Sequence, residues 1–169
     1  MDPLAHASIG LIVKPIVPKA PLWALLAATQ VPDLLCFGFM AAGVEYGAVN
    51  QLDLEHGLEY LSLPSIPWSH GLFMCVVWSA VVAAIALLLW RDRRTSIVMG
   101  LAVFSHWFLD FVVYLNIPVF FDNSQLIGLG LITSRPGLIL GIVLEIVLIA
   151  GGIGVYLAKA RESGRGVQA

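Results

Sequence analysis

The chain has 169 residues, of which 59% are hydrophobic and only 12% are charged. Soluble globular domains are usually about 45–50% apolar and about 25% charged, so this composition excludes an ordinary water-soluble domain and predicts an integral membrane protein. The formal net charge of −2 gives no reason to expect a nucleic-acid partner. Cys36 and Cys75 both lie in apolar runs, which favours small hydrophobic side chains over a disulfide framework.

Five apolar segments follow one another along the chain. The first, at about 3–14, ends at Lys14 and the prolines after it, and at about 1.5 Å per residue it crosses about half a bilayer. Each of the other four has at least the about 20 residues that a spanning helix needs. They cover about 21–44, 70–90, 96–116 and 136–157. The sequence therefore predicts a single all-α transmembrane domain over 1–169, with four long helices and a short N-terminal membrane helix.

The distribution of basic residues predicts the orientation. Alternation of the long helices puts eight of the nine Lys and Arg residues on one side, namely Lys14, Lys19, Arg91, Arg93, Arg94, Lys159, Arg161 and Arg165. The stretch 45–68 carries acidic residues and neither Lys nor Arg. By the positive-inside rule we expect the basic side and the C-terminus in the cytoplasm, with 45–69 and 116–135 outside. Within the outer acidic stretch, 52–61 could form a short interfacial helix.

A small set of polar residues lies inside the predicted membrane segments. Charged groups at bilayer depth cost at least about 2.5–3.5 kcal/mol on insertion scales, so such residues are functional candidates. The set includes His6, Asp33, His70, His106 and Asp110, together with Gln30 and Glu145. His106 and Asp110 are spaced i, i+4 and can therefore point at one object.

Imidazole and carboxylate are the usual ligands of zinc and related divalent ions, so we expect the three histidines and two aspartates of this set to hold a divalent metal ion, most simply zinc. Asp33 would be either a ligand or the general base that orients a water molecule. Gln30, three residues before Asp33 on the same helix face, could hold Asp33 or the substrate.

Other interpretations stay open at this point. His6 reaches the site only if the short helix runs inward from the outside, with 14–19 as the cytoplasmic turn; otherwise it is an interfacial histidine. His106 and Asp110 could be a buried pair that only holds helices together. Glu145 fits a structural hydrogen-bonding role better than a ligand role.

The order of four short motifs points to a family. They are His6-x3-Gly10, Gln30-Val31-Pro32-Asp33-Leu34, Ser69-His70-Gly71 and Ser105-His106-x3-Asp110. Over the stretch from His6 to about Gly130, the chain resembles inner-membrane metal-dependent hydrolases of the YdjM type, also described as LexA-binding membrane hydrolases. The resemblance implies hydrolysis, with the two aspartates and three histidines of these motifs as metal-site residues.

The chain departs from that family pattern at two places. Leu35 stands where the family often has a second acid, which argues against a two-metal site. Ser69-His70-Gly71 stands where the family often has Thr-His-Ser.

The sequence thus favours a membrane-embedded metal-dependent hydrolase with its site near the outer leaflet. The expected substrate is a lipid or lipid-linked ester or phosphoester, reached through a polar cavity rimmed by 50–68 and 116–132. The alternative is a non-catalytic membrane protein that uses the cluster to sense or transport a metal ion or protons, or to pack helices. Membrane lipid is the expected partner, while the substrate, the number of metal ions and the oligomeric state stay open.

Overall fold

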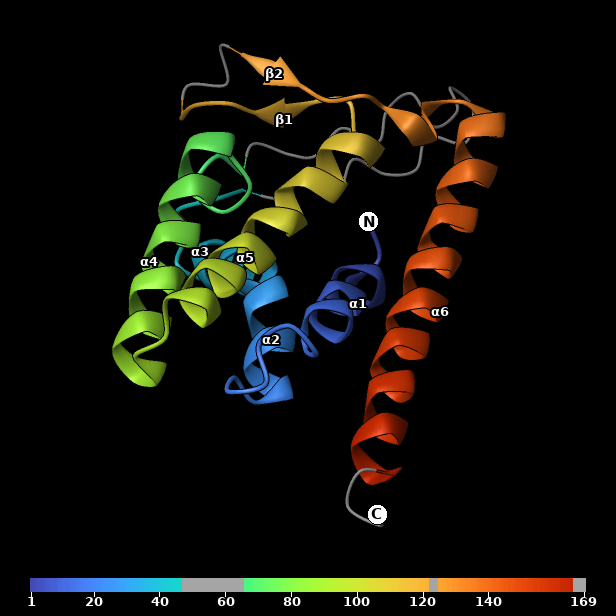
Figure 1. The fold of residues 1–169 in the computed structure, drawn as a ribbon. Coiled ribbons are helices and arrows are strands. Elements are labelled where there is room, and N and C mark those ends of the chain that lie inside the picture. Colours follow the sequence, from blue (N-terminus) through green and yellow to red (C-terminus); the bar gives the residue numbers. More distant parts are fainter. Residues whose placement is uncertain (47–65, 122–124, 166–169) are drawn as a thin grey trace.

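The computed structural model describes residues 1–46, 66–121 and 125–165, and this part of the chain is mainly helical (Figure 1). The helices are α1 (Pro3–Val13), α2 (Leu22–Thr29), α3 (Val31–Ala41), α4 (Leu72–Trp90), α5 (Arg93–Val113) and α6 (Arg135–Arg165). A small hairpin of β1 (Ile117–Pro118) and β2 (Leu126–Ile127) and a 3-10 turn, η2 (Leu131–Thr133), join α5 to α6. The predicted interfacial helix at 52–61 lies outside the described residues.

Three helices, α4, α5 and α6, are long and apolar enough to cross a membrane, and the bent pair of α2 and α3 gives a fourth candidate span. α5 is the central helix, because it packs against α1, α2, α3 and α4 and is the most buried of the three long helices. α6 stands at the side of the bundle, where it packs along α1 (Figure 1). Its remaining apolar surface is mostly exposed, as expected of a face that meets lipid.

The first predicted long helix, 21–44, is wrong as a single helix. The chain forms α2 and α3 instead, bent by 57° at Gln30. The cause is Pro32, which has no backbone N–H to donate to the carbonyl one turn earlier and whose ring crowds that turn. The break thus leaves the C-terminus of α2 and the N-terminus of α3 in the middle of the bundle.

The other predicted boundaries shift at their ends. The helix predicted at 96–116 begins at Arg93, because the Asp92 side chain accepts the N–H of Thr95 and caps α5, and it ends at Val113. The helix predicted at 70–90 begins at Leu72, since His70 and Gly71 belong to the turn before it. A Cβ atom at Gly71 would clash with the Pro67 carbonyl oxygen, so this turn requires glycine.

Two basic connections meet at one end of the bundle, the end that also holds the C-terminus (Figure 1). Lys19, in the turn after α1, forms a 2.9 Å ion pair with Asp92, in the connection between α4 and α5. Hydrogen bonds from Thr95 and Lys19 hold the pKa of Asp92 below its usual range. We refer to this as the basic end; the hairpin lies at the opposite end.

α1 descends from the middle of the bundle toward the basic end (Figure 1). Its first turn is capped by Asp2, whose carboxylate accepts the N–H of Leu4 at 2.8 Å, and Pro3 supplies a helix-compatible φ at the first position. At about 1.5 Å per residue its 11 residues extend about 16 Å, so α1 reaches only about half-way across a bilayer.

Candidate metal centre

All five candidate metal ligands singled out from the sequence meet in the middle of the bundle, although they come from four different elements. His6 lies on α1, Asp33 lies in the first turn of α3, and His70 lies just before α4. His106 and Asp110 lie on adjacent turns of α5. The three histidines and Asp110 are buried, whereas the Asp33 side chain keeps 30% of its surface exposed. Asp33 is therefore the most accessible residue of the cluster.

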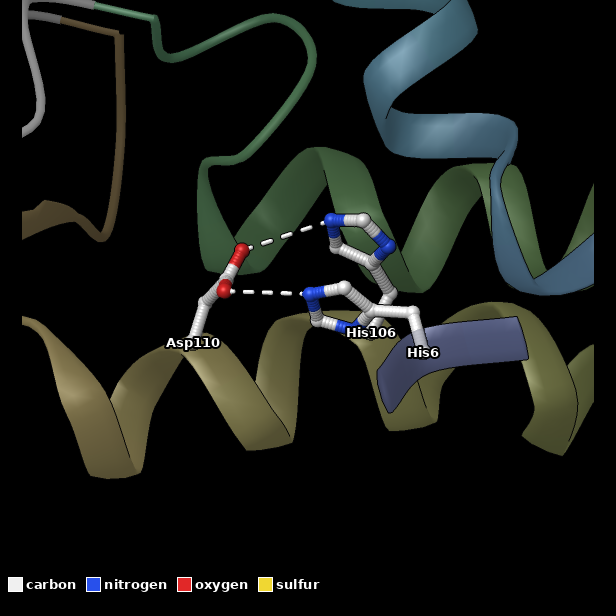
Figure 2. Close-up of side chains that lie close together, drawn as sticks. All are labelled: His6, His106 and Asp110. Carbon is white, nitrogen blue, oxygen red and sulfur yellow. Dashed lines mark ion pairs between the residues drawn. The ribbon is translucent and has the colours of Figure 1, made fainter. Parts of the chain in front are cut away.

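The donor atoms form two groups of three that share His106. One group is His6, His106 and Asp110, shown in Figure 2, and the other is Asp33, His70 and His106. Within each group the nitrogen and oxygen atoms lie within 4.8 Å of one another, which is close enough for one small cation to contact all three.

Four distances between imidazole nitrogens and carboxylate oxygens test whether zinc would fit. His70 Nε2 lies 3.3 Å from Asp33 Oδ1 and 3.9 Å from Asp110 Oδ2. His106 Nε2 lies 3.5 Å and 3.3 Å from the same two atoms. Ligand bonds of about 2.0–2.1 Å put neighbouring ligand atoms of tetrahedral zinc about 3.3–3.4 Å apart. Three of the four distances are close to this spacing, and the fourth, from His70 Nε2 to Asp110 Oδ2, is longer.

The tautomer of His106 follows from its other ring nitrogen. Nδ1 lies 2.8 Å from the backbone carbonyl oxygen of Thr29, which can only accept, so Nδ1 carries the proton and donates it. The lone pair of the neutral ring is then on Nε2, which faces Asp33 and Asp110. This buried nitrogen has no hydrogen-bond partner within the described part of the chain.

The helix break makes this arrangement possible. In an unbroken helix the Thr29 carbonyl would accept the N–H of Asp33. Because the chain bends at Gln30, that carbonyl is free to accept from His106 instead. The same bend puts Asp33 at the N-terminus of α3, where the helix dipole and unpaired N–H groups favour a negative charge. Pro32 therefore helps to position two of the cluster residues.

Asp110 is engaged through both carboxylate oxygens. Oδ2 faces His106 and His70, whereas Oδ1 lies 3.3 Å from His6 Nε2. The amino group of Met1 also donates to Oδ1, at 2.9 Å. His6 stacks on the His106 ring with centroids 3.7 Å apart, and its Nδ1 is buried with no partner among the described residues. His6 thus adds a third imidazole on the α1 side of Asp110 (Figure 2).

Gln30 has a different partner from the one expected from the sequence. Its side-chain amide donates to the carbonyl oxygen of Pro3 at 2.8 Å and so ties the bend to the start of α1, rather than holding Asp33. Glu145 of α6 accepts the backbone N–H of Asp2 at 3.1 Å, a structural contact as expected.

Two contributors were missed from the sequence. The Thr29 carbonyl is a backbone group that only the break exposes, although Pro32 two residues after Gln30 is a visible signal of such a break. Glu45 was assigned to an outer loop, yet its buried carboxylate contacts the residue next to His70.

A cavity of about 260 Å³ lies beside the cluster, on the hairpin side. It is lined by the first two residues of the chain, the end of α5, η2 and the first turns of α6, and its polar members include Asp2, Tyr114 and Glu145. Met1 and Tyr114 connect it to the cluster, since the Met1 amino group contacts both Asp110 and the Tyr114 hydroxyl. Of the expected rim, Ile132 lines this cavity, whereas most of 50–68 lies outside the described residues.

Comparison of the chain with protein-family models, with curated proteins and with solved structures finds no match in any of the three.

Proposed function

We propose that the chain is a membrane-embedded hydrolase that uses a divalent metal ion, most simply zinc, held by His70, His106 and Asp110, with Asp33 either as a further ligand or as the general base. His6 would contact the same site from α1. The observation that carries the proposal is the buried Nε2 of His106, whose lone pair faces two carboxylates. An acceptor that faces acceptors is unfavourable unless a proton on Nε2 or a metal cation lies between them. The zinc-like spacing in three of the four donor distances supports the metal ion.

Hydrolysis is proposed on the chemistry of this donor set and on the motif order that resembles the YdjM-type hydrolases. Bound zinc lowers the pKa of a coordinated water to about 7 and polarises the bond to be cleaved. Asp33 is the residue placed to act as general base, because it is the most exposed of the five. Among the described residues, Asp33 contacts both histidines through Oδ1. Its other oxygen, Oδ2, would then take the proton from water.

The membrane position suggests the substrate class. If the basic end faces the cytoplasm, as the positive-inside rule requires, the cavity beside the cluster lies on the outer side. We therefore propose a lipid or lipid-linked ester or phosphoester of the outer leaflet of the inner membrane as the substrate. Asp33 would be reached from this leaflet, while the four buried members of the cluster position the reacting bond.

Metal analysis of the purified protein in detergent tests the metal site. We expect about one equivalent of zinc per chain in the wild type and in His56→Ala, which replaces the one histidine not proposed as a ligand, and little zinc in His106→Ala. A wild type that neither retains nor rebinds zinc or another divalent ion would refute the metal site.

Hydrolysis is tested separately, by release of headgroup or acyl product from a panel of ester and phosphoester lipids in reconstituted vesicles. Zinc-dependent release that is lost in Asp33→Asn would support the enzyme. Zinc binding with no release from any lipid of the panel would instead favour the rival function, in which the cluster senses or transports ions or holds the helices together.

A further inference from the structure

We propose that Glu45 and Ser69 form a hydrogen-bonded relay that fixes the orientation and the tautomer of His70, so that its Nε2 lone pair points into the metal site. The inference rests on the proposed metal site and adds two positioning residues to it. All three members are buried, with exposed fractions of 2% for Glu45, 0% for Ser69 and 5% for His70.

Counting donors and acceptors gives the direction of each hydrogen bond. A carboxylate can only accept, and Glu45 accepts three hydrogen bonds. Its Oε1 takes the backbone N–H groups of Trp68 at 2.7 Å and Ser69 at 2.9 Å, and its Oε2 takes the Ser69 hydroxyl at 2.8 Å. The single hydroxyl proton of Ser69 is therefore committed to Glu45.

The contact between Ser69 and His70 then has only one possible direction. Ser69 Oγ lies 2.9 Å from His70 Nδ1 and has no second proton to offer, so Oγ accepts and Nδ1 donates. A neutral ring with its proton on Nδ1 carries its lone pair on Nε2. That atom faces Asp33 Oδ1 at 3.3 Å, which is the metal-site side of the ring.

Ser69 Oγ accepts the Nδ1–H of His70, just as the Thr29 carbonyl oxygen accepts the Nδ1–H of His106. Each imidazole donates Nδ1–H to a fixed acceptor and presents Nε2 to the same pair of carboxylates. Acceptors of this kind orient metal-binding histidines and raise their basicity, and losing one typically costs 10–100-fold in metal affinity. Glu45 also holds the backbone N–H groups just before His70, so it fixes the turn that carries the ring.

Glu45→Gln is the informative variant because it keeps the size of the side chain. The glutamine oxygen is needed by the two backbone N–H groups, so its NH₂ group faces Ser69 and donates to Oγ. The Ser69 hydroxyl then turns to donate to His70 Nδ1, which moves the ring proton to Nε2 and removes the lone pair from the site. Ser69→Ala is the second variant and removes the acceptor of Nδ1–H.

The first experiment reads the tautomer of His70 by nitrogen-15 NMR of the metal-free protein in detergent at alkaline pH. The signal is assigned by its loss in His70→Ala. We expect Nδ1–H in the wild type and in Glu162→Gln, a matched exposed glutamate on α6, and Nε2–H in Glu45→Gln. A wild-type ring protonated on Nε2, or a Glu45→Gln ring that stays protonated on Nδ1, would overturn the relay.

The second experiment measures zinc affinity of the same proteins. We expect a 10–100-fold loss in Glu45→Gln and in Ser69→Ala, with Glu162→Gln unchanged and with apo-protein melting temperatures that do not follow the loss. Because the tautomer is measured without metal, failure of the relay can be distinguished from failure of the proposed metal site. A wild type that binds no zinc refutes the proposed function alone, whereas an unchanged tautomer in Glu45→Gln refutes the relay alone.

Discussion

Replacement of Gly152 by alanine tests how closely α6 must hold α1. A Cβ atom at this position would lie 2.8 Å from the Ser8 carbonyl oxygen and 3.1 Å from Ser8 Cβ. A backbone oxygen within α1 cannot swing aside as a side-chain tip can, so the two helices must separate. Overpacking of this kind costs about 1–3 kcal/mol. At Gly151 an added Cβ would meet nothing within 4 Å, so alanine there stabilises the helix by up to about 1 kcal/mol.

We therefore expect Gly152→Ala to be less stable than Gly151→Ala by about 2–4 kcal/mol in equilibrium unfolding in detergent. Zinc affinity should fall in the first variant and not in the second, because α1 carries His6 two residues before Ser8. A Gly152→Ala protein as stable as Gly151→Ala would refute the proposed tight packing of α1 on α6. Loss of stability without any change in zinc affinity would remove His6 from the metal site.

Four more outcomes follow from the structure. Asp33→Asn should weaken zinc binding by about tenfold or more in calorimetric titration with little change in melting temperature, and unchanged binding would exclude Asp33 as a ligand. Pro32→Ala restores a backbone N–H at the bend and should lower zinc affinity about 10–100-fold; an unaltered affinity would mean that the bend does not position the site. In a chain with its native cysteines replaced, a thiol introduced at Gln125 should react with an impermeant reagent from outside, and one at Arg94 only after permeabilisation; the reverse pattern would invert the orientation. Asp92→Ala should be less stable than wild type at pH 7, with the gap in melting temperature closing below about pH 4, because the lowered pKa of Asp92 stabilises the native state only while the carboxylate is charged. A gap that is equally wide at pH 3 would contradict that linkage.

The parts of the fold that could be predicted from the sequence are those set by composition. Long apolar runs bounded by charges give α4, α5 and α6, because a spanning helix is determined mainly by hydropathy and length. The bend at Gln30 could not be read this way, since Val31 and Pro32 are as apolar as a continuous helix requires. Only the missing N–H of Pro32 marks the break, and sequence alone does not say whether such a proline kinks a helix or ends it.

The cluster residues were accessible to sequence reasoning because ionisable groups inside apolar helices are rare and costly. The groups that orient them were not. Glu45 lies 24 residues before Ser69 and at the edge of an acidic stretch, where a glutamate is ordinarily solvated. The Thr29 carbonyl carries no sequence signal of its own, because every residue has one. The contacts of Glu45 and of the Thr29 carbonyl depend on which chain segments the fold brings together.

The distribution of the cluster along the chain has a consequence for biosynthesis. His6 and Asp33 enter the bilayer while α5, which carries His106 and Asp110, has yet to be translated. Until α5 arrives, the early helices hold ionisable groups whose partners do not exist, a state that insertion energetics disfavour. A nascent chain stalled before about residue 93 therefore leaves these polar groups without their partners within the membrane. The cluster would thus be complete once α5 is in place, before α6 is translated.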